Sequence, residues 1–297
     1  MMIKQIQSLP PKRVHTLVGL FPEALAELLA VVLPEVDRRR QAARATRPHR
    51  HRAPGAGRKR RLNPAQEVLL VLLYLRHNVA HGVVGQMFGV SADVSEDLFH
   101  EIVPLLRDLC PANRFDAEKR WQRNAPPWQP DALDLVLLDT FETSVPRPTG
   151  EARQRRVYSG KKKRHTLKTQ VATDARGEIL ALDAGHRGPA ADKRIYEGST
   201  IATQFPTATK QGDLAYTGTA GVLTPHRKPR GGVLSDELRQ ENRRLASVRV
   251  HVEHGIRRLK AFRILREHYR HALGLFPMVA AAVGGLVHLA RILQQTG

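Results

Sequence analysis

The chain has 297 residues, 41% of them hydrophobic and 26% charged, which suffices for about two domains with buried cores. Its 48 Lys and Arg residues outnumber 28 Asp and Glu residues, so the net charge is +20. A surplus of that size favours a polyanionic partner, most often nucleic acid, and argues against an acidic metabolic enzyme. The single cysteine, Cys110, excludes an internal disulfide framework and a cysteine-based zinc finger.

Neither a membrane span nor a secretory signal is expected. The most apolar run near the C-terminus, residues 278–289, is about a dozen residues long, whereas a spanning helix needs about 20. We interpret this run as a buried helix. The opening residues, MMIKQIQSLPPKR, contain no apolar core followed by a small-residue cleavage site. A soluble intracellular protein without membrane contact is therefore expected.

Charge and composition divide the chain into three parts. Residues 1–61 hold 14 basic and 4 acidic side chains, residues 62–150 hold 7 and 12, and residues 151–297 hold 27 and 12. A proline-rich run, APPWQP, puts the last domain boundary near residue 125. The expected domains are a short helix plus a basic arm (1–61), a helical domain (62–124) and an α/β domain (125–297).

The basic arm runs from Arg38 to Arg61, after a short helix predicted over residues 21–33. It contains eleven Lys and Arg residues, several Pro and Gly residues and no acid, so it is expected to be disordered when free. We expect it to neutralise DNA phosphates, and the alternative is a solvated linker. The residues of the arm assigned to DNA contact are Arg58, Lys59, Arg60 and Arg61.

The second part has the pattern of a helix-turn-helix. Asn63-Pro64 predicts a helix start, and a strongly apolar helical run follows over residues 64–76. A short helix over 83–88, a turn at Gly89-Val90-Ser91 and a helix over 92–106 complete the pattern. The last helix carries four acids, whereas a DNA-reading helix usually carries Arg, Lys, Asn or Gln. A packed helical bundle or a protein-binding surface is thus an equal alternative.

The third part predicts an α/β fold with a mixed sheet. The expected elements are a buried strand over 133–141, a hairpin formed by 165–174 and 178–185, a helix over 189–200, a short strand or turn at GDLAYTG, and a long helix over 235–265 with Ser235 as its N-cap. Asp139, Asp213 and Glu253 fall at a strand end, in the short strand or turn, and in the long helix. If they converge, they form a carboxylate cluster in a basic domain.

Such a cluster has one strong chemical use, namely binding Mg²⁺, which prefers oxygen ligands. Two ions about 3.5–4 Å apart stabilise both the attacking and the leaving oxygen of a phosphoryl displacement. For Glu253, spacing alone favours another interpretation. Arg249 and Arg257 lie four residues before and after it on the same helix face, as in an ordinary salt-bridged helix.

Several motifs, in chain order, resemble those of DDE transposases of bacterial insertion sequences. Arg249, Glu253 and Lys260 have the spacing of the R(3)E(6)K signature of that family. The blocks LLDTF, YSGKKKRHTLKTQ, GDLAYTG, LTPHRKPRG and SVRVHVEHGIRRLKAFRIL resemble blocks of its subgroup related to PIF/Harbinger elements. The resemblance covers roughly residues 133–270, with a looser similarity to the family's helix-turn-helix over 62–106.

The resemblance implies a ribonuclease H-like domain in which Asp139, Asp213 and Glu253 bind two Mg²⁺ or Mn²⁺ ions. It implies metal-dependent nicking of double-stranded DNA at transposon inverted-repeat ends and attack of the freed 3′-hydroxyl on target DNA. It also implies a homodimer or a larger synaptic complex in a prokaryotic cytoplasm, associated with the nucleoid. The further residues assigned to DNA contact are Lys161, Lys162, Lys163, Arg164, Arg249, Arg257 and Lys260.

The chain departs from the family pattern in three places. Asp-Thr-Phe stands where the family has Asp-Gly-Thr after the first acid, Ala215 replaces a glycine, and Ala191 replaces the histidine before Asp192. Asp192 therefore competes with Asp213 as second metal ligand, and we prefer Asp213 because its surroundings lie nearer the family pattern. The departures leave two alternatives, a DNA-binding relative without catalysis and a metal-dependent endonuclease without strand transfer.

Overall fold

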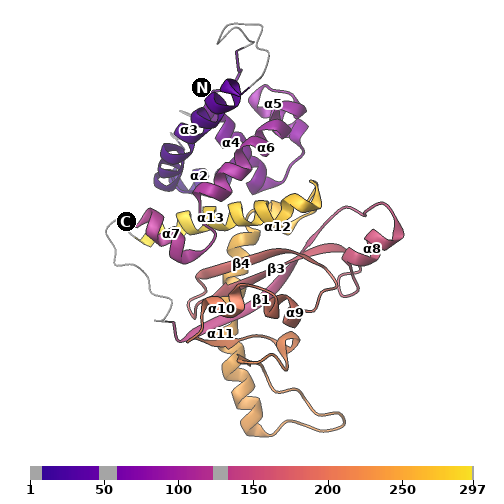
Figure 1. The fold of residues 1–297 in the computed structure, drawn as a ribbon. Coiled ribbons are helices and arrows are strands. Elements are labelled where there is room, and N and C mark those ends of the chain that lie inside the picture. The colour runs from indigo at the N-terminus through magenta and orange to yellow at the C-terminus, as the bar shows by residue number, and fades with distance from the viewer. Residues whose placement is uncertain (1–8, 47–58, 123–132, 296–297) are drawn as a thin grey trace.

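The computed structural model describes residues 9–46, 59–122 and 133–295, and it stacks a helical region on a sheet (Figure 1). The helices of the first region are α2 (Pro11–Val18), α3 (Pro22–Ala45), α4 (Pro64–His77), α5 (His81–Phe88), α6 (Ala92–Leu109) and α7 (Arg114–Trp121). The strands of the second region are β1 (Leu135–Ser144), β2 (Tyr158–Ser159), β3 (Arg164–Thr173), β4 (Ile179–Arg187), β5 (Thr209–Gln211) and β6 (Val222–Leu223). Its helices are α8 (Glu151–Val157), α9 (Asp192–Glu197), α10 (Ile201–Gln204), η2 (Leu214–Tyr216), α11 (Asp236–Lys260), α12 (Arg263–Arg266), η3 (Leu273–Leu275) and α13 (Phe276–Gln295).

The predicted helix-turn-helix is confirmed as α5 and α6. Before it, Asn63 caps α4 in a capping box, since its side chain accepts a hydrogen bond from Gln66 N while Gln66 Oε1 accepts one from Asn63 N. Gly89 ends α5 in the left-handed region, at φ 70°, and Ser91 caps α6 by accepting from Val94 N. Local chemistry thus sets both the turn and the two helix ends.

The first eight residues of the predicted disordered arm are helical, so the prediction was wrong for them. The helix α3 continues to Ala45 instead of ending near residue 33. Arg40 is the reason visible in the structure, because its guanidinium lies 2.6 Å from Glu67 of α4 and 2.5 Å from Glu101 of α6. Ion pairs with acids far away in the sequence thus neutralise arginine charges that would otherwise repel one another. The arm's residues 47–58 lie outside the described part of the chain.

The sheet has the strand order of the ribonuclease H-like fold, as the resemblance implied. The order is β4-β3-β1-β5-β6, with the short β2 pairing beside β3. The pairs β1–β3 and β3–β4 are antiparallel, whereas β1–β5 and β5–β6 are parallel. The turn at Ala175-Arg176-Gly177 joins β3 to β4, which confirms the predicted hairpin. The expected mixed sheet is therefore confirmed.

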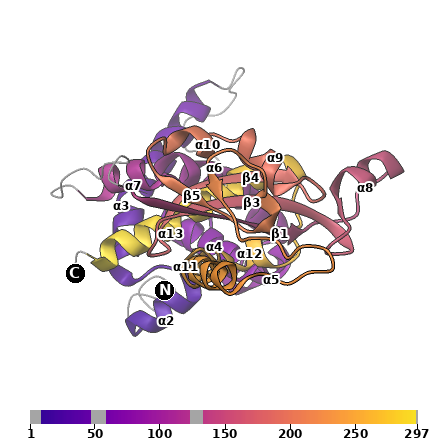
Figure 2. The ribbon, with the colours of Figure 1, turned by 90° about the horizontal axis from the view of Figure 1, so that it is seen from below.

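Helices cover both faces of the sheet (Figure 2). Alternate residues of β1 face opposite sides, as the pleat of a strand requires. Leu137 and Phe141 pack into the large core that contains residues of α11 and α13, whereas Val136 and Leu138 pack into a second core with Tyr216. Successive side chains of β1 therefore face α11 on one side of the sheet and α9 and α10 on the other.

Two predicted helices differ in extent from the structure. Ser235 caps α11 as predicted, by accepting from Leu238 N at 3.3 Å, but the helix ends at Lys260 and the short α12 follows. The helix predicted over 189–200 is only α9, which begins at Asp192 and ends before Gly198.

The helix α13 lies between the helical region and the sheet (Figure 1). By length and composition residues 273–294 pass as a membrane span, but 67% of the most apolar window is buried inside the protein. This agrees with the prediction of a buried helix. Gly285 makes close contact possible, because a Cβ there would collide with the backbone oxygen of Cys110 after α6.

Candidate active site

Asp139 lies within β1, which continues to Ser144, so the prediction that it falls at a strand end was wrong. Asp213 follows the end of β5, the strand parallel to β1. The last pair in the β1–β5 ladder is Leu137 with Gln211. Asp139 and Asp213 each follow two residues later, so the fold brings them to the same edge of the sheet. In open α/β sheets this edge is where ligands bind.

Each of these two carboxylates is oriented by a backbone N–H. Oδ1 of Asp139 accepts a hydrogen bond from Thr140 N at 2.8 Å, and Oδ1 of Asp213 accepts one from Ala215 N at 2.9 Å. The second bond also caps the short helix η2. Within the described residues, Oδ2 of each carboxylate has no hydrogen bond. One oxygen of each side chain is therefore held in place, and the other is open for a ligand.

Asp139 sits in an environment that disfavours its charge. Burial, together with the nearby Asp213 and Asp192, raises the pKa of Asp139 to about 6 against the lowering effects of the Thr140 N–H and Arg249. Three acids are thus within electrostatic range of one another. Carboxylates gathered in this way favour binding of a cation, because it removes their mutual repulsion.

Asp192, the competing second ligand, has a partner of its own. Its Oδ1 lies 2.7 Å from Lys168 Nζ, and the same ammonium donates to the backbone oxygen of Ala190. Asp192 is the first residue of α9, whose N-cap is Ala191, and its side chain does not cap the helix. The two acids therefore differ, since Asp192 is ion-paired and Asp213 has no ion pair with a residue that the structure describes.

Glu253 lies on α11, on the helix face that also carries Arg249 and Lys260. Arg249, one turn earlier, lies 3.6 Å from Glu253 and also acts on Asp139. Lys260, two turns later, lies 5.0 Å from the Phe141 ring centroid and is within electrostatic range of Asp139 and Glu142. Since both cations share a helix face with Glu253, that face is turned to Asp139. The predicted ion pair with Arg249 is present, whereas the exposed Arg257 forms none with a described residue.

A cleft of about 570 Å³ opens beside Asp139. Lys260 lines it from α11, and burial together with the nearby Lys162 lowers the pKa of Lys260. In the predicted basic run, Lys161, Lys162 and Lys163 form an exposed turn and Arg164 begins β3, and the first two lysines line the cleft. Positive charge therefore borders the acids on two sides, as a site for a phosphate backbone requires.

Sequence reasoning missed a buried polar network beneath the acids. Gln170 of β3 donates to the hydroxyl of Tyr216 at 3.1 Å, and burial raises the pKa of Tyr216 with added effects of Asp192, Asp139 and Asp213. Lys168 belongs to the same strand face. The signal lay within YSGKKKRHTLKTQ, where Lys168 and Gln170 alternate with residues of the other face.

The cations assigned to DNA contact in the arm are partly engaged inside the protein. Arg60 lies 2.9 Å from Glu67 and 3.5 Å from Glu101, and Arg61 donates to the backbone oxygen of Gly89 at 2.6 Å. Lys59 is exposed, and Arg58 lies outside the described residues.

The donor set at the sheet edge fits divalent metal ions. Asp139, Asp213 and the nearby Glu253 offer carboxylate oxygens, the ligands that Mg²⁺ and Mn²⁺ prefer. Neither aspartate is neutralised by an arginine or lysine ion pair among the described residues. Carboxylates in such an arrangement favour the binding of a cation.

Comparison with known proteins agrees with this arrangement. A helix-turn-helix of DDE superfamily endonucleases matches residues 60–112, which indicates DNA binding. A probable transposase for insertion sequence element IS702 of Microchaete diplosiphon is 29% identical over 236 residues, which are 77% of this chain and 82% of the relative. A second relative, also named as a transposase, for insertion sequence element IS112 of Streptomyces albus G, is 28% identical over 254 residues, 84% of each chain.

Among solved structures, a pre-cleavage Mos1 transpososome is similar at 10% identity, over 75% of this chain and 84% of that chain, with a TM-score of 0.17. A score that low does not indicate a shared arrangement of elements. The decisive match is the model of the DDE superfamily endonucleases, which covers residues 138–292. Since this is more than half of the chain and both relatives carry transposase names, the protein belongs to the DDE superfamily endonucleases and is an enzyme of the transposase kind.

Proposed function

We propose that this transposase nicks double-stranded DNA at the inverted-repeat ends of its insertion sequence and joins the freed 3′-hydroxyl to target DNA. The observation that carries the proposal is the position of Asp139 and Asp213, each two residues beyond the last pair of the β1–β5 ladder. Arg249, on the α11 face that bears Glu253, is within electrostatic range of Asp139. Enzymes of this superfamily use divalent metal ions, and these three residues would hold two Mg²⁺ or Mn²⁺ ions. Such ions activate water or a hydroxyl and stabilise the leaving oxygen.

The residues of the chain orient the reactants. Thr140 and Ala215, which line the cleft, fix the two aspartates through their backbone N–H groups. Lys168 holds Asp192 in an ion pair, and we assign it to positioning rather than to metal binding. Arg249 would orient Glu253, which lies 3.6 Å from its guanidinium. Its remaining N–H groups would contact DNA phosphate.

The cations around the cleft would hold the DNA backbone. Lys161, Lys162 and Lys260 line the cleft, and Lys163, Arg164 and Arg257 extend the basic surface. Contacts of this kind position DNA and carry no sequence information. Reading of the ends would fall to the helix-turn-helix and to the remaining arm residues, Arg58 and Lys59. Because two ends react together, we propose a homodimer or larger synaptic complex acting on chromosomal DNA in a prokaryotic nucleoid, and a subgroup related to PIF/Harbinger elements.

Strand transfer is tested apart from cleavage by supplying an end that is already cut. A duplex carrying the inverted repeat and a free 3′-hydroxyl is incubated with supercoiled plasmid and Mg²⁺ or Mn²⁺. The proposal predicts covalent joining of the labelled duplex to the plasmid, and none when the end carries a 3′-dideoxynucleotide. A protein that nicks uncut ends but never joins the cut end is an endonuclease without strand transfer.

A further inference from the structure

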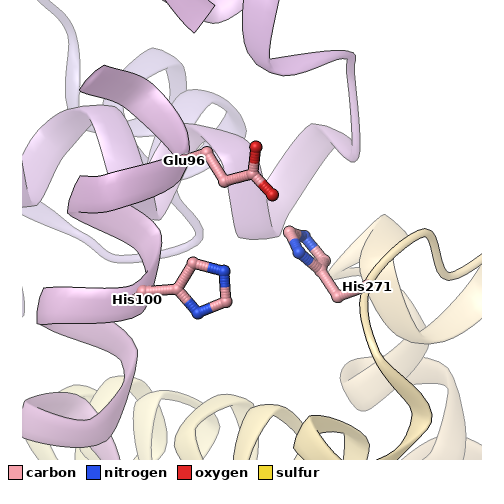
Figure 3. A group of neighbouring side chains, drawn as sticks. All are labelled: Glu96, His100 and His271. Atoms are coloured by element: carbon pink, nitrogen blue, oxygen red, sulfur yellow. The ribbon is translucent and has the colours of Figure 1, made fainter. Parts of the chain in front are cut away.

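A second group of metal-ligand side chains lies far from the cleft, beside the helix-turn-helix. Glu96 and His100 are one turn apart on α6, and His271 comes from the segment between α12 and η3 (Figure 3). One ligand atom from each residue lies within 4.8 Å of those of the other two. Glu96 and His100 are exposed, so an ion from solvent can reach them.

Among the described residues Glu96 has no cationic partner, unlike Glu101 and Asp108 of the same helix. Glu101 is paired with Arg40, and Asp108 with Arg39. By contrast, Glu96 forms no hydrogen bond or ion pair with a described residue and lies near His100 and His271 instead. The function of its charge is therefore not explained by the packing of α3 on α6.

The histidine from the distant segment is held as a metal ligand usually is. Its ring stacks on Phe99 with centroids 3.9 Å apart, and its Nε2 lies 2.8 Å from the hydroxyl of Tyr74. A hydrogen bond to one ring nitrogen fixes the ring and leaves the other nitrogen for a metal.

A third histidine adjoins the group. The His81 ring lies 5.4 Å from that of His271, its Nδ1 is bonded to Ser95 Oγ at 2.9 Å, and its Nε2 is buried without a hydrogen-bond partner among the described residues. A buried nitrogen without a partner costs free energy unless something at the site satisfies it. A water molecule bound to the metal in the fourth position of a tetrahedral site would donate the hydrogen bond that the His81 Nε2 lacks among the described residues.

We propose that Glu96, His100 and His271 bind a zinc-like transition-metal ion that ties the second helix of the helix-turn-helix to the segment preceding α13. Two imidazoles and one carboxylate are a common zinc ligand set, whereas Mg²⁺ prefers oxygen alone. The site is therefore chemically distinct from the carboxylates at the sheet edge. Because its ligands come from two regions 171 residues apart, an ion would fix the helix-turn-helix relative to the sheet.

The test measures zinc bound to the untagged full-length chain. The protein is stripped with a chelator, loaded with Zn²⁺, desalted and analysed by elemental mass spectrometry. We expect about one zinc ion per chain, lost in Glu96→Gln and in His100→Gln, whose exposed side chains leave the fold intact. Asp97→Asn, a neighbouring exposed acid on α6, and Asp139→Asn, at the sheet edge, should both retain the ion.

Two further measurements separate a built site from surface binding. Loading with Co²⁺ should give the intense visible absorption of tetrahedral coordination, absent from the His100→Gln variant. Tyr74→Phe keeps the ring but removes the hydroxyl beside His271, and it should weaken zinc affinity by about 10- to 100-fold. Wild-type protein without zinc after desalting, or zinc retained equally by Glu96→Gln and His100→Gln, would overturn the proposal.

Discussion

At the scale of single residues, the environment of Asp139 matters most. A carboxyl that is buried and faces Asp213 and Asp192 resists ionisation, and its pKa is raised from 3.8 to about 6. The folded protein then binds this proton more tightly than the unfolded chain does. Stability from this group is full below pH 3.8 and is lost as the pH rises through about 6. In the metal-free protein, the candidate ligand is thus a source of instability at neutral pH.

Asp139→Asn should therefore stabilise the metal-free protein at alkaline pH. In EDTA at about pH 8, we expect the free energy of unfolding to rise by up to about 3 kcal/mol, because the amide carries no charge to bury. Below about pH 4 the variant and the wild type should be alike. Urea denaturation at both pH values measures the difference, and excess Mg²⁺ should reverse it by stabilising the wild type alone. A variant less stable than wild type at about pH 8 would contradict this account.

At the scale of elements, α11 is placed on the sheet by a glycine. A Cβ at Gly255 would lie 2.8 Å from Thr173 Cγ2 and 3.1 Å from the backbone oxygen of Gly177. The helix therefore packs directly on the β3–β4 hairpin. Glu253, two residues earlier, depends on this close approach for its distance from Asp139.

Gly255→Ala should destabilise the protein although alanine favours helices. Helix propensity contributes about 1 kcal/mol in its favour, but overpacking costs about 1–3 kcal/mol, so we expect a net loss of about 1 kcal/mol and reduced nicking. Gly82→Ala is the matched control, since Gly82 lies in α5 with no atom within 4 Å of the added carbon. It should leave stability unchanged or raise it. Urea denaturation measures the free energy of unfolding of both variants. A Gly255→Ala variant more stable than the wild type would contradict the close packing of α11 on the hairpin.

The basic turn before β3 is the second element with a testable role. Removing Lys161 and Lys162 together should weaken DNA binding equally for all sequences, and should reduce the slope of log affinity against log salt by about 2. Lys119→Ala, on α7, serves as the control for loss of an exposed lysine. Affinities are measured by fluorescence anisotropy over a salt series. An unchanged slope in the double variant would remove these lysines from the DNA interface.

The elements show which parts of the fold a sequence discloses. The caps at Asn63 and Ser235 and the hairpin turn before Gly177 rest on neighbours within four residues, and the structure confirms them. Ion pairs between residues far apart in the sequence left no signal in the local sequence pattern. Arg40 meets acids 27 and 61 residues away, so a helix stood where a disordered arm was predicted, and Lys168 meets Asp192 at a separation of 24. The acid positions followed from motif resemblance rather than from spacing.

At the scale of the whole molecule, α13 joins the helix-turn-helix region to the sheet. Its residues share one core with α6 and with β1. Cys110, directly after α6, is fully buried against it, and burial raises the pKa of its thiol to about 12. The reaction rate of this thiol therefore measures separation of the two regions, because a reagent cannot reach it until the contact between α13 and Cys110 opens.

Gly285→Ala should open that contact. Its added carbon would collide with the Cys110 backbone oxygen, and overpacking of about 1–3 kcal/mol implies labelling of the thiol by a disulfide reagent at least about 5-fold faster. Gly274→Ala, where no atom lies within 4 Å of the added carbon, should label at the wild-type rate. Equal labelling rates of the wild type and both variants would show that the packing of α13 does not control access to the Cys110 thiol.

The central claim is that Asp139, Asp213 and Glu253 form one metal-dependent nuclease site. Its most direct test is nicking of a duplex carrying the inverted repeats that flank the gene, with Mg²⁺ or Mn²⁺ against EDTA. We predict nicking by the wild type only with metal, and a loss of more than about a hundredfold in Asp139→Asn, Asp213→Asn and Glu253→Gln, since even changes one shell away from a metal cost about 10- to 100-fold. Asp192→Asn should retain part of the activity. Wild-type protein that binds the duplex but never cuts it, or full activity in Glu253→Gln, would contradict the account.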